Sequence, residues 1–488
     1  MLFTEPAFLF LFLPVLLGLY FLQRGTHAAY GNWLLLIFSV VFYAIGGGSF
    51  TLLMLASIAF NYYMAIAIDR ARGATRPPRA ETLLSVAVGV DLVVLGIFKY
   101  ANFFADNVNT LFLVLGVRPI VVPRILLPIG ISFFTFHAIS YVVDVYRRDA
   151  TAQKSPVHAA LYLLLFPQLI AGPIIRYRDL ADQLARRVVS LDDFAYGVRR
   201  FVIGLSKKVL IANVVAGPAD KIFSMPLAEV SAGHAWLAIV CYTVQIYFDF
   251  SGYSDMAIGL GRMFGFRFTE NFRWPYIAQS IQDFWRRWHI SLSSWFRDYL
   301  YKPLGGSRVS PARTYLNLVT VFFLCGLWHG ASWNFVVWGL WHGLFLVIER
   351  AWEPSARRPG KSPVLSWPVW PHAYTMLVVM IGWVFFRAPT LTAATAFLKS
   401  MAGLNAPART PYTVQWYLTA EVWLALAAGA IGSTPWVPAL AQSIATRRPP
   451  AIRVTVDALS TVTLIVLLVA SIMQVAAGTY NPFIYFQF

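Results

Sequence analysis

Four histidines lie in or beside long apolar stretches of this sequence, and they are its strongest candidates for proton-transfer chemistry. They are His137, His289, His329 and His342. Because a low dielectric disfavours the imidazolium form, a buried histidine stays neutral and is able to act as a general base near pH 7. A lone buried histidine is more often a hydrogen-bonded packing residue, and we expect that role for His137 and His342.

His329 differs from the others because a polar break surrounds it. Residues 326–334 (GLWHGASWN) separate two apolar pieces, 315–324 and 335–348, and each piece is too short to cross a bilayer alone. We therefore expect the break to lie within the membrane, beside a cavity. Its two glycines allow another backbone or a substrate to come close.

Five polar or aromatic side chains are predicted to line this cavity. They are Gln245, Asp249, Trp328, Ser332 and Asn334. Gln245 and Asp249 are four residues apart and so share one face of a helix, ahead of a predicted polar kink at residues 250–255. Helix packing through small residues explains that stretch equally well.

The aromatic tail at residues 481–488 (NPFIYFQF) follows the last apolar run and contains a further candidate, Tyr485. Such a tail is typical of the aromatic belt at a membrane interface. A sharper interpretation is that the tail folds back and delivers the Tyr485 hydroxyl to the histidine centre from outside, as an acyl-accepting nucleophile.

Other catalytic signatures are missing from the sequence. It contains no zinc-ligand spacing and no HExxH, P-loop or Gly-x-Ser-x-Gly motif, so metal catalysis is unsupported. Cys241 and Cys325 both lie in apolar stretches, and we expect them to be packing residues.

The elements that must position these residues are membrane helices. Hydrophobic residues make up 58% of 488 positions and charged residues 12%, about half the charged share of a soluble protein. The apolar residues form runs of roughly 20, long enough to span a hydrocarbon core. The net charge of +17 comes from Lys and Arg between the runs, which indicates cytoplasmic loops near anionic membrane lipids rather than nucleic-acid binding.

Four basic clusters predict the topology. They lie at residues 70–79, 147–154, 357–361 and 447–453. If all four are cytoplasmic, the N-terminus lies outside, and the first apolar run, 2–22, is a retained span rather than a signal peptide. The final run, 458–477, then carries the chain out, and the tail after Gly478 is also outside.

Two segments depart from simple spans. Residues 161–175 have basic residues on both sides, so we expect them to enter and leave on the cytoplasmic side, with a turn within 166–173. Residues 262–313 are rich in Trp, Arg and Phe, and we expect helices that lie along the cytoplasmic interface.

Six motifs, in order, resemble those of the membrane-bound O-acyltransferase family, in its bacterial branch that exports acyl groups to cell-surface polymers. They are LPIGISF (127–133), FPQLIAGP (166–173), YFDFSGYSDM (247–256), FWRRWHISLS (284–293), GLWHG (326–330) and the tail. The resemblance covers the whole chain and is closest to the alginate O-acetylation group.

The resemblance implies one all-α domain, with about 11–12 membrane helices and additional re-entrant helices around a central tunnel. Its parts would be N-terminal helices (1–126), a catalytic core with re-entrant segments (127–350), C-terminal helices (351–477) and a periplasmic tail (478–488).

The resemblance also implies roles for individual residues. His329 matches the family's catalytic histidine, and His289 matches the second polar residue of its core. In relatives that have a separate small peptide with a similar motif, the peptide's tyrosine carries the acyl group, and Tyr485 matches that tyrosine. Four basic residues are candidates to bind the phosphates of the donor. They are Arg286, Arg287, Lys207 and Lys208.

The implied activity is that of an acetyltransferase in the bacterial inner membrane. Acetyl-CoA would be the cytoplasmic donor, no metal is implied, and a periplasmic serine-dependent (SGNH-type) O-acetyltransferase would pass the group to an exported polysaccharide. Alginate is the first candidate, with peptidoglycan or cellulose as alternatives and D-alanine export to teichoic acids as a poorer fit. Transient acetylation of His329 itself is a rival mechanism.

A solute transporter is the alternative class, because discontinuous helices and central polar residues also mark transport paths. The two halves of the sequence show no inverted repeat, which favours the acyltransferase. The sequence fixes neither the polymer nor the oligomeric state, and exposed apolar surface would allow a homodimer.

Overall fold

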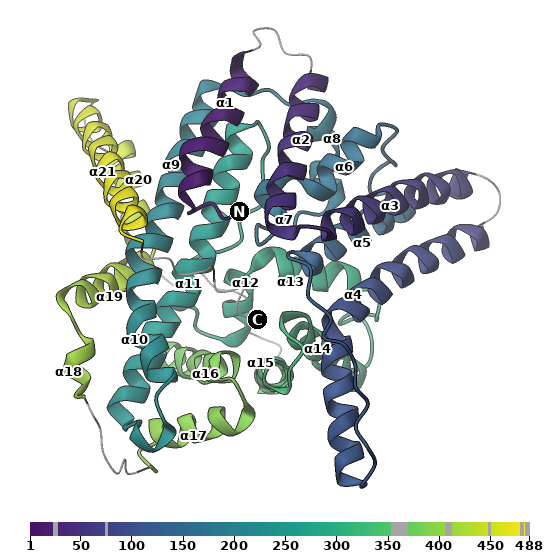
Figure 1. The fold of residues 1–488 in the computed structure, drawn as a ribbon. Coiled ribbons are helices and arrows are strands. Elements are labelled where there is room, and N and C mark those ends of the chain that lie inside the picture. The colour runs from purple at the N-terminus through teal and green to yellow at the C-terminus, as the bar shows by residue number, and fades with distance from the viewer. Residues whose placement is uncertain are drawn as a thin grey trace. The chain divides into compact units, whose positions relative to one another are not determined.

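The structure, a computed structural model, contains helices and no strand among the residues that it describes (Figure 1). These are residues 1–22, 28–73, 77–352, 369–405, 412–447, 450–478 and 483. The predicted all-α class is confirmed. The chain packs as two compact units, whose three boundaries follow Phe201, Asp255 and Thr269. The predicted subdivision at residues 126, 350 and 477 stays a prediction.

The N-terminal unit comprises Met1–Phe201 and Met256–Thr269. Its elements are η1 (Phe8–Phe12), α1 (Leu13–Leu22), α2 (Ala28–Gly47), α3 (Phe50–Gly73), α4 (Pro77–Val114), α5 (Ile131–Arg147), α6 (Pro156–Leu164), α7 (Phe166–Leu169), α8 (Tyr177–Ala185) and most of α9 (Leu191–Ser206). Helices α3, α4 and α5 pack against one another, and α2 packs against α6. The chain breaks at Leu165 between α6 and α7, one residue before the predicted turn, and turns again at residues 170–171, within it.

The C-terminal unit comprises Val202–Asp255 and Glu270–Phe488. Its elements are η2 (Lys207–Ala212), α10 (Asn213–Phe223), η3 (Leu227–Glu229), most of α11 (Ala232–Met263), η4 (Pro275–Ile277), α12 (Ile281–Arg287), α13 (Ile290–Phe296), η5 (Arg297–Tyr301), α14 (Pro311–His329), α15 (Trp333–Trp352), α16 (Val369–Arg387), α17 (Leu391–Met401), α18 (Val414–Tyr417), α19 (Ala420–Gly432), α20 (Trp436–Arg447) and α21 (Pro450–Ala476).

Several helix starts follow directly from local sequence. The side-chain oxygens of Ser280, Ser310, Thr390 and Thr419 accept hydrogen bonds from the first turns of α12, α14, α17 and α19. Such caps satisfy amides that have no partner inside the helix. Proline at the first position of α14 is also favourable, because its φ is preset and it lacks an N–H.

Six described helical stretches are long and apolar enough to cross a membrane. They are Ala29–Gly47, Phe50–Gly73, Arg79–Val114, Leu191–Phe223, Val369–Arg387 and Val454–Ala476. A bent pair, Ala420–Gly432 and Trp436–Ile444, adds a seventh if it forms one span. The first predicted span, 2–22, is shorter than expected, because its helix begins only at Phe8.

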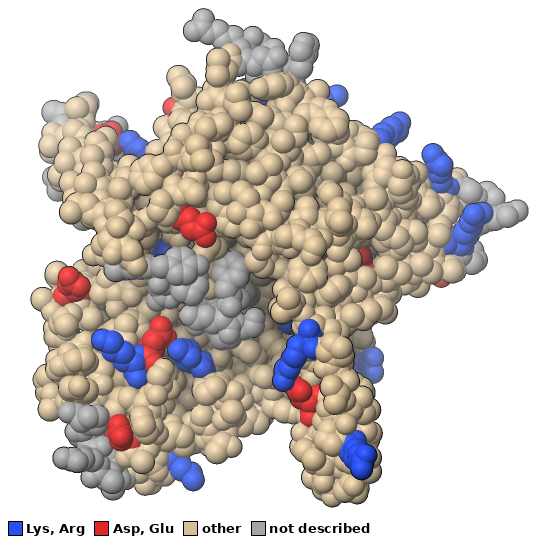
Figure 2. Space-filling view, viewed as in Figure 1, with Lys and Arg blue, Asp and Glu red and all other residues tan. Residues whose placement is uncertain are grey.

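The surface agrees with a membrane location. Many large apolar side chains are exposed on α3, α4 and α21, and Lys, Arg, Asp and Glu are sparse on the face seen in Figure 2. Apolar surface of this extent is unfavourable in water and favourable in hydrocarbon, where helices satisfy their own backbone groups. The chain is therefore a polytopic membrane protein.

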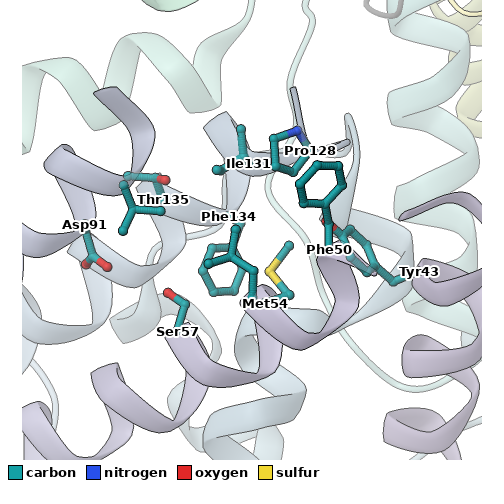
Figure 3. Close-up of a pocket in the computed structure, with 11 residues that line it drawn as sticks. Tyr43, Phe50, Met54, Ser57, Asp91, Pro128, Ile131, Phe134 and Thr135 are labelled. Carbon is teal, nitrogen blue, oxygen red and sulfur yellow. The ribbon is translucent and has the colours of Figure 1, made fainter. Parts of the chain in front are cut away.

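A small cavity in the N-terminal unit contains one carboxyl group among mostly apolar side chains. Figure 3 shows Asp91 and Thr135 at one end of it and Tyr43 and Phe50 at the other. Asn61 Nδ2 donates to Asp91 Oδ1 at 2.9 Å, whereas Asp91 Oδ2 is buried with no hydrogen-bond partner within the described part of the chain. This carboxyl has a neutral partner rather than a cation.

Candidate active site

Helix α12 leads directly to His289 and is fixed at its start. The Ser280 hydroxyl accepts from Asp283 N at 3.0 Å, and the Glu349 carboxylate of α15 accepts from Ile281 N at 2.6 Å and Gln282 N at 3.0 Å. A carboxylate at a helix N-terminus satisfies free amides and interacts favourably with the helix dipole. These bonds therefore anchor α12 to the end of α15.

His289 has a left-handed backbone conformation, with φ of 43°, which is uncommon outside glycine. This residue separates α12 from α13. Two backbone hydrogen bonds join the turn at His289 to the irregular segment before α12. Arg273 N donates to Arg287 O, and Ile290 N donates to Asn271 O, both at 2.9 Å. Unfavourable backbone conformations persist where the surroundings enforce them, so these bonds explain how the fold holds His289 in place.

The His289 imidazole is fully buried and contacts an asparagine. Its Nδ1 lies 3.1 Å from Asn271 Oδ1, and Asn271 Nδ2 donates to Ser254 Oγ of α11 at 2.9 Å. The other ring nitrogen, Nε2, is buried and makes no hydrogen bond to any described residue. Asn271 is fully buried and was not predicted. It lies in an irregular segment, where no helical periodicity marks it.

His329 is the last residue of α14, so the predicted polar break is shorter than expected. Only residues 330–332 are non-helical between α14 and α15. Gly326 packs α14 closely against α15, where a Cβ would collide with the Phe335 carbonyl oxygen. This glycine therefore packs α14 against α15 rather than interrupting the helix, so the two helices extend beyond the predicted apolar pieces. Neither α14 nor α15 is among the described helices that are long and apolar enough to cross a membrane, and the depth of the break stays a prediction.

Aromatic rings surround the His329 imidazole. Their centroids lie 4.9 Å away for Trp328, 4.8 Å for Trp338 and 5.3 Å for Phe386. His329 retains 8% exposure, whereas His289 and His342 have none. Asn334 Nδ2 donates to Ala388 O and ties the start of α15 to the chain just after Phe386. Of these three histidines, His329 is the one that keeps accessible surface.

The two predicted catalytic histidines share an aromatic neighbour. The Trp328 ring centroid is 4.9 Å from that of His329 and 6.3 Å from that of His289. Helix α14 and the turn between α12 and α13 therefore place both histidines close to Trp328, although the two are 40 positions apart in the sequence.

The tail contributes Phe483 to the same region. This side chain is buried, and its ring centroid lies 4.7 Å from Tyr253 and 6.0 Å from Phe250. Phe250 in turn meets His289 edge-on, with centroids 4.6 Å apart. Tyr485 lies outside the described residues, so its role stays a prediction.

Comparison with known proteins identifies the family. The model of the membrane-bound O-acyltransferase family matches residues 123–387. The chain belongs to this family. It is 45% identical to a protein of Azotobacter vinelandii and 43% identical to one of Pseudomonas putida, each named probable alginate O-acetylase AlgI, over the full length of all these chains. It is also 37% identical to a peptidoglycan O-acetyltransferase of Helicobacter pylori, over 83% of this chain and 80% of the relative.

These matches confirm the predicted family and the predicted enzyme class. The chain is a multi-pass membrane-bound acyltransferase. Family membership also sets aside the solute transporter that was considered from the sequence.

Two further histidines of this acyltransferase are packed in its interior. His137 Nε2 accepts a hydrogen bond from Ile175 N at 3.2 Å within the N-terminal unit. His342 lies among aromatic rings, with centroids 5.3 Å away for both Trp285 and Trp338, and neither of its nitrogens has a hydrogen-bond partner in the described residues. Both environments agree with the expected packing role.

The lysines predicted to bind donor phosphates are paired with carboxylates. Lys207 Nζ lies 2.7 Å from Asp255 Oδ2, and Lys208 Nζ lies 3.1 Å from Asp249. The side chains of Lys208 and Asp249 are almost fully buried. The two lysines begin the π-helical segment η2, in the middle of an apolar span. Their charges are therefore already balanced inside the protein.

The predicted arginines differ in accessibility. Arg286 is exposed, whereas Arg287 Nε donates to both carboxylate oxygens of Asp283 at 2.9 Å. Arg286 is therefore the better placed of the two to meet a soluble anion.

The remaining predicted cavity residues are buried or half-buried. Gln245 is buried one turn before Asp249 on α11, which continues as a helix through the predicted kink at 250–255. Ser332 is half-buried in the short break after His329. Whether these side chains line a tunnel stays a prediction.

Proposed function

We propose that this acyltransferase moves acetyl groups from cytoplasmic acetyl-CoA across the bacterial inner membrane for O-acetylation of exported alginate. The observation that carries the proposal is the full-length similarity, at 45% identity, to a relative named for alginate O-acetylation. The arrangement of His289, His329 and Phe483 supports it: Trp328 contacts both histidines, and Phe250 contacts both His289 and Phe483. Both termini would then be periplasmic.

The first chemical step is acyl transfer from a thioester to a hydroxyl. A phenol with a pKa of about 10 is almost entirely unionised at pH 7, so attack by the Tyr485 hydroxyl requires a base. His329 takes the phenolic proton as the oxygen bonds to the thioester carbonyl carbon. The carbon–sulfur bond then breaks, and His329 returns the proton to the departing sulfur. The products are acetyl-Tyr485 and the CoA thiol.

The second step takes place outside the membrane. A periplasmic serine-dependent acetyltransferase accepts the acetyl group on its own hydroxyl and transfers it to the polysaccharide. In this scheme the membrane protein supplies the acetyl group, and its partner selects the polymer. The buried position of Phe483, two residues before Tyr485, supports a tail that folds back toward the histidines.

The donor enters from the cytoplasmic side, where its phosphates need cationic partners. Arg286 is the first candidate because it is exposed. Arg287, Lys207 and Lys208 each have a carboxylate partner, so their binding of phosphate would require an exchange of ion pairs. We expect Arg286→Ala to raise KM for acetyl-CoA by about 3- to 10-fold, the loss expected for one charge-assisted hydrogen bond at a partly solvated site.

Release of CoA thiol by the wild-type protein and two variants tests the proposed function. Purified protein incubated with acetyl-CoA should release CoA thiol, and His329→Ala should abolish the release. His372→Ala, a change of a half-buried histidine in α16, is the matched control and should retain the activity. Absence of thiol release by folded wild-type protein with its periplasmic partner would contradict the proposal.

Peptidoglycan is the second candidate polymer, favoured by the similarity to the Helicobacter pylori enzyme. Deletion of this protein in its host, followed by measurement of ester-linked acetate on alginate and on peptidoglycan, separates the two. We expect loss of acetate from alginate alone. Loss from peptidoglycan alone would favour the alternative.

A further inference from the structure

The orientation of the Asn271 side chain is fixed by a group that is able only to donate. The backbone amide of Ser291 donates to Asn271 Oδ1 at 3.2 Å, so the atom at that position must be the carbonyl oxygen. The opposite assignment would place the NH₂ group against another N–H. The amide nitrogen of Asn271 correspondingly donates to Ser254 Oγ at 2.9 Å.

The fixed amide determines which nitrogen of His289 carries hydrogen. Asn271 Oδ1 is an acceptor, and His289 Nδ1 lies 3.1 Å from it, so Nδ1 bears the proton. A neutral imidazole has one N–H, and its other nitrogen is then a lone-pair acceptor. His289 Nε2 is therefore unprotonated, and it is the atom left without a partner in the described residues.

The surroundings of His289 keep the ring neutral. The side chains that pack on it are Phe250 from α11, Phe272, Ser291 from α13 and Trp328 from α14, and none of them carries a charge. Burial lowers the pKa of His289 to about 3. The Nδ1–H form is thus the expected state across the neutral pH range.

We propose that Asn271 is a positioning residue for acyl transfer: it holds His289 in the Nδ1–H tautomer, so that Nε2 faces the reaction centre as a hydrogen-bond acceptor. Trp328 contacts the rings of both His289 and His329. Phe250 contacts the rings of both His289 and Phe483. During acyl transfer, Nε2 accepts a hydrogen bond from the reacting hydroxyl. This inference rests on the proposed acyl transfer at His329.

Asn271 is needed to select one tautomer of His289 because the two tautomers of free imidazole differ little in energy. Without the carbonyl of Asn271, the proton is able to occupy Nε2, and the nitrogen at the centre becomes a donor. The Ser291 amide keeps the Asn271 side chain from rotating by half a turn, because a backbone N–H only donates. Ser291 N and Asn271 together therefore determine whether His289 accepts or donates.

Variants of Asn271 test the proposal through the kinetics of CoA release. Asn271→Leu removes the acceptor while keeping a side chain branched at Cγ, and we expect kcat to fall at least 100-fold, the usual contribution of a positioned acid or base, with KM changed less than 3-fold. Asn271→Asp keeps oxygens for His289 Nδ1–H and for Ser291 N, so the fold should survive. It is the informative variant if the leucine protein does not fold.

The pH profile distinguishes positioning from a structural role. A carboxylate beside Nδ1 stabilises imidazolium, which donates through Nε2 instead of accepting. In Asn271→Asp we therefore expect the acid limb of kcat to move upward by at least one pH unit, with activity recovering at high pH. Asn317→Asp, at another buried asparagine of the same unit, is the control and should leave the acid limb of the kcat profile at its wild-type pH.

Two results would overturn the inference while leaving the proposed function intact. One is a wild-type pH profile in active Asn271→Asp. The other is a nitrogen NMR spectrum of histidine-labelled protein in which the signal lost in His289→Asn is that of the Nε2–H tautomer. Asparagine is a suitable replacement because it tolerates the left-handed backbone of residue 289. Failure of wild-type protein to release CoA would instead contradict the proposed function itself.

Discussion

Two histidines of the C-terminal unit, His289 and His342, are equally buried but differ in almost every other respect. His289 occupies a left-handed turn between two short helices, and a fully buried asparagine accepts from one of its ring nitrogens. His342 lies inside the regular helix α15, surrounded by aromatic rings, with both nitrogens unbonded among the described residues. The difference shows that burial alone does not identify a histidine able to take part in proton transfer. We propose that an orientation imposed by the fold, as at His289, does identify one.

The largest expected effect is on the rate of CoA release when His289 is replaced. We predict that His289→Asn lowers the rate of CoA release by about 10² to 10⁴, because it removes an oriented proton acceptor. Thermal unfolding should change little, since asparagine accepts the backbone conformation and retains polar atoms. Turnover and melting temperature measured on the same preparation provide the check. A rate of CoA release by His289→Asn within 3-fold of wild type would show that His289, like His342, is a packing residue.

A comparable effect on stability is expected at the buried ion pair of α11 and η2. Lys208→Met removes a cation that pairs with the buried Asp249 carboxylate, and we predict a loss of about 3–5 kcal/mol of unfolding free energy. Replacement of both partners, Lys208→Met with Asp249→Leu, should recover most of that loss, because neither charge remains. Denaturant unfolding in detergent measures both. Equal destabilisation by the single and double variants would show that the pair itself, rather than the orphaned charge, matters.

His342 provides the smaller effect on the other side of the comparison. Its nitrogens make no hydrogen bond to described residues, so His342→Leu removes unsatisfied polar groups at similar volume. We predict a change in stability of less than about 1.5 kcal/mol in either direction and CoA release within 3-fold of wild type. A loss of activity as large as that of His289→Asn would assign His342 a chemical role.

Parts of the fold and, separately, of the candidate site were predictable from sequence because helices and their interruptions have local signatures. The turn within 166–173 and the position of His329 beside a glycine-containing break both follow from residue types and spacing. The length of the break did not, because Gly326 looks the same in sequence whether it interrupts a helix or packs one. Asn271 was not predicted because its proposed role depends on contacts with Ser254 and His289, and only the tertiary fold creates these contacts.

The smallest effect is expected at Asp91 in the N-terminal unit, whose carboxyl has the neutral partner Asn61. An ionised carboxylate without a cation is costly in an apolar span, so this group should be neutral. Asp91→Asn then preserves both shape and charge, and we predict a stability change below about 1 kcal/mol. Melting temperatures of the two proteins give the test. A large destabilisation would reveal an ionised Asp91 with a cationic partner.

Intact-protein mass analysis after incubation with acetyl-CoA measures whether the histidine centre places an acetyl group on Tyr485. We predict a mass increase of one acetyl group in wild-type protein and in the control Tyr412→Phe, where an exposed tyrosine is changed, and no increase in Tyr485→Phe or His329→Ala. A label that survives Tyr485→Phe but disappears in His329→Ala would contradict the tyrosine relay and place the acetyl group on His329.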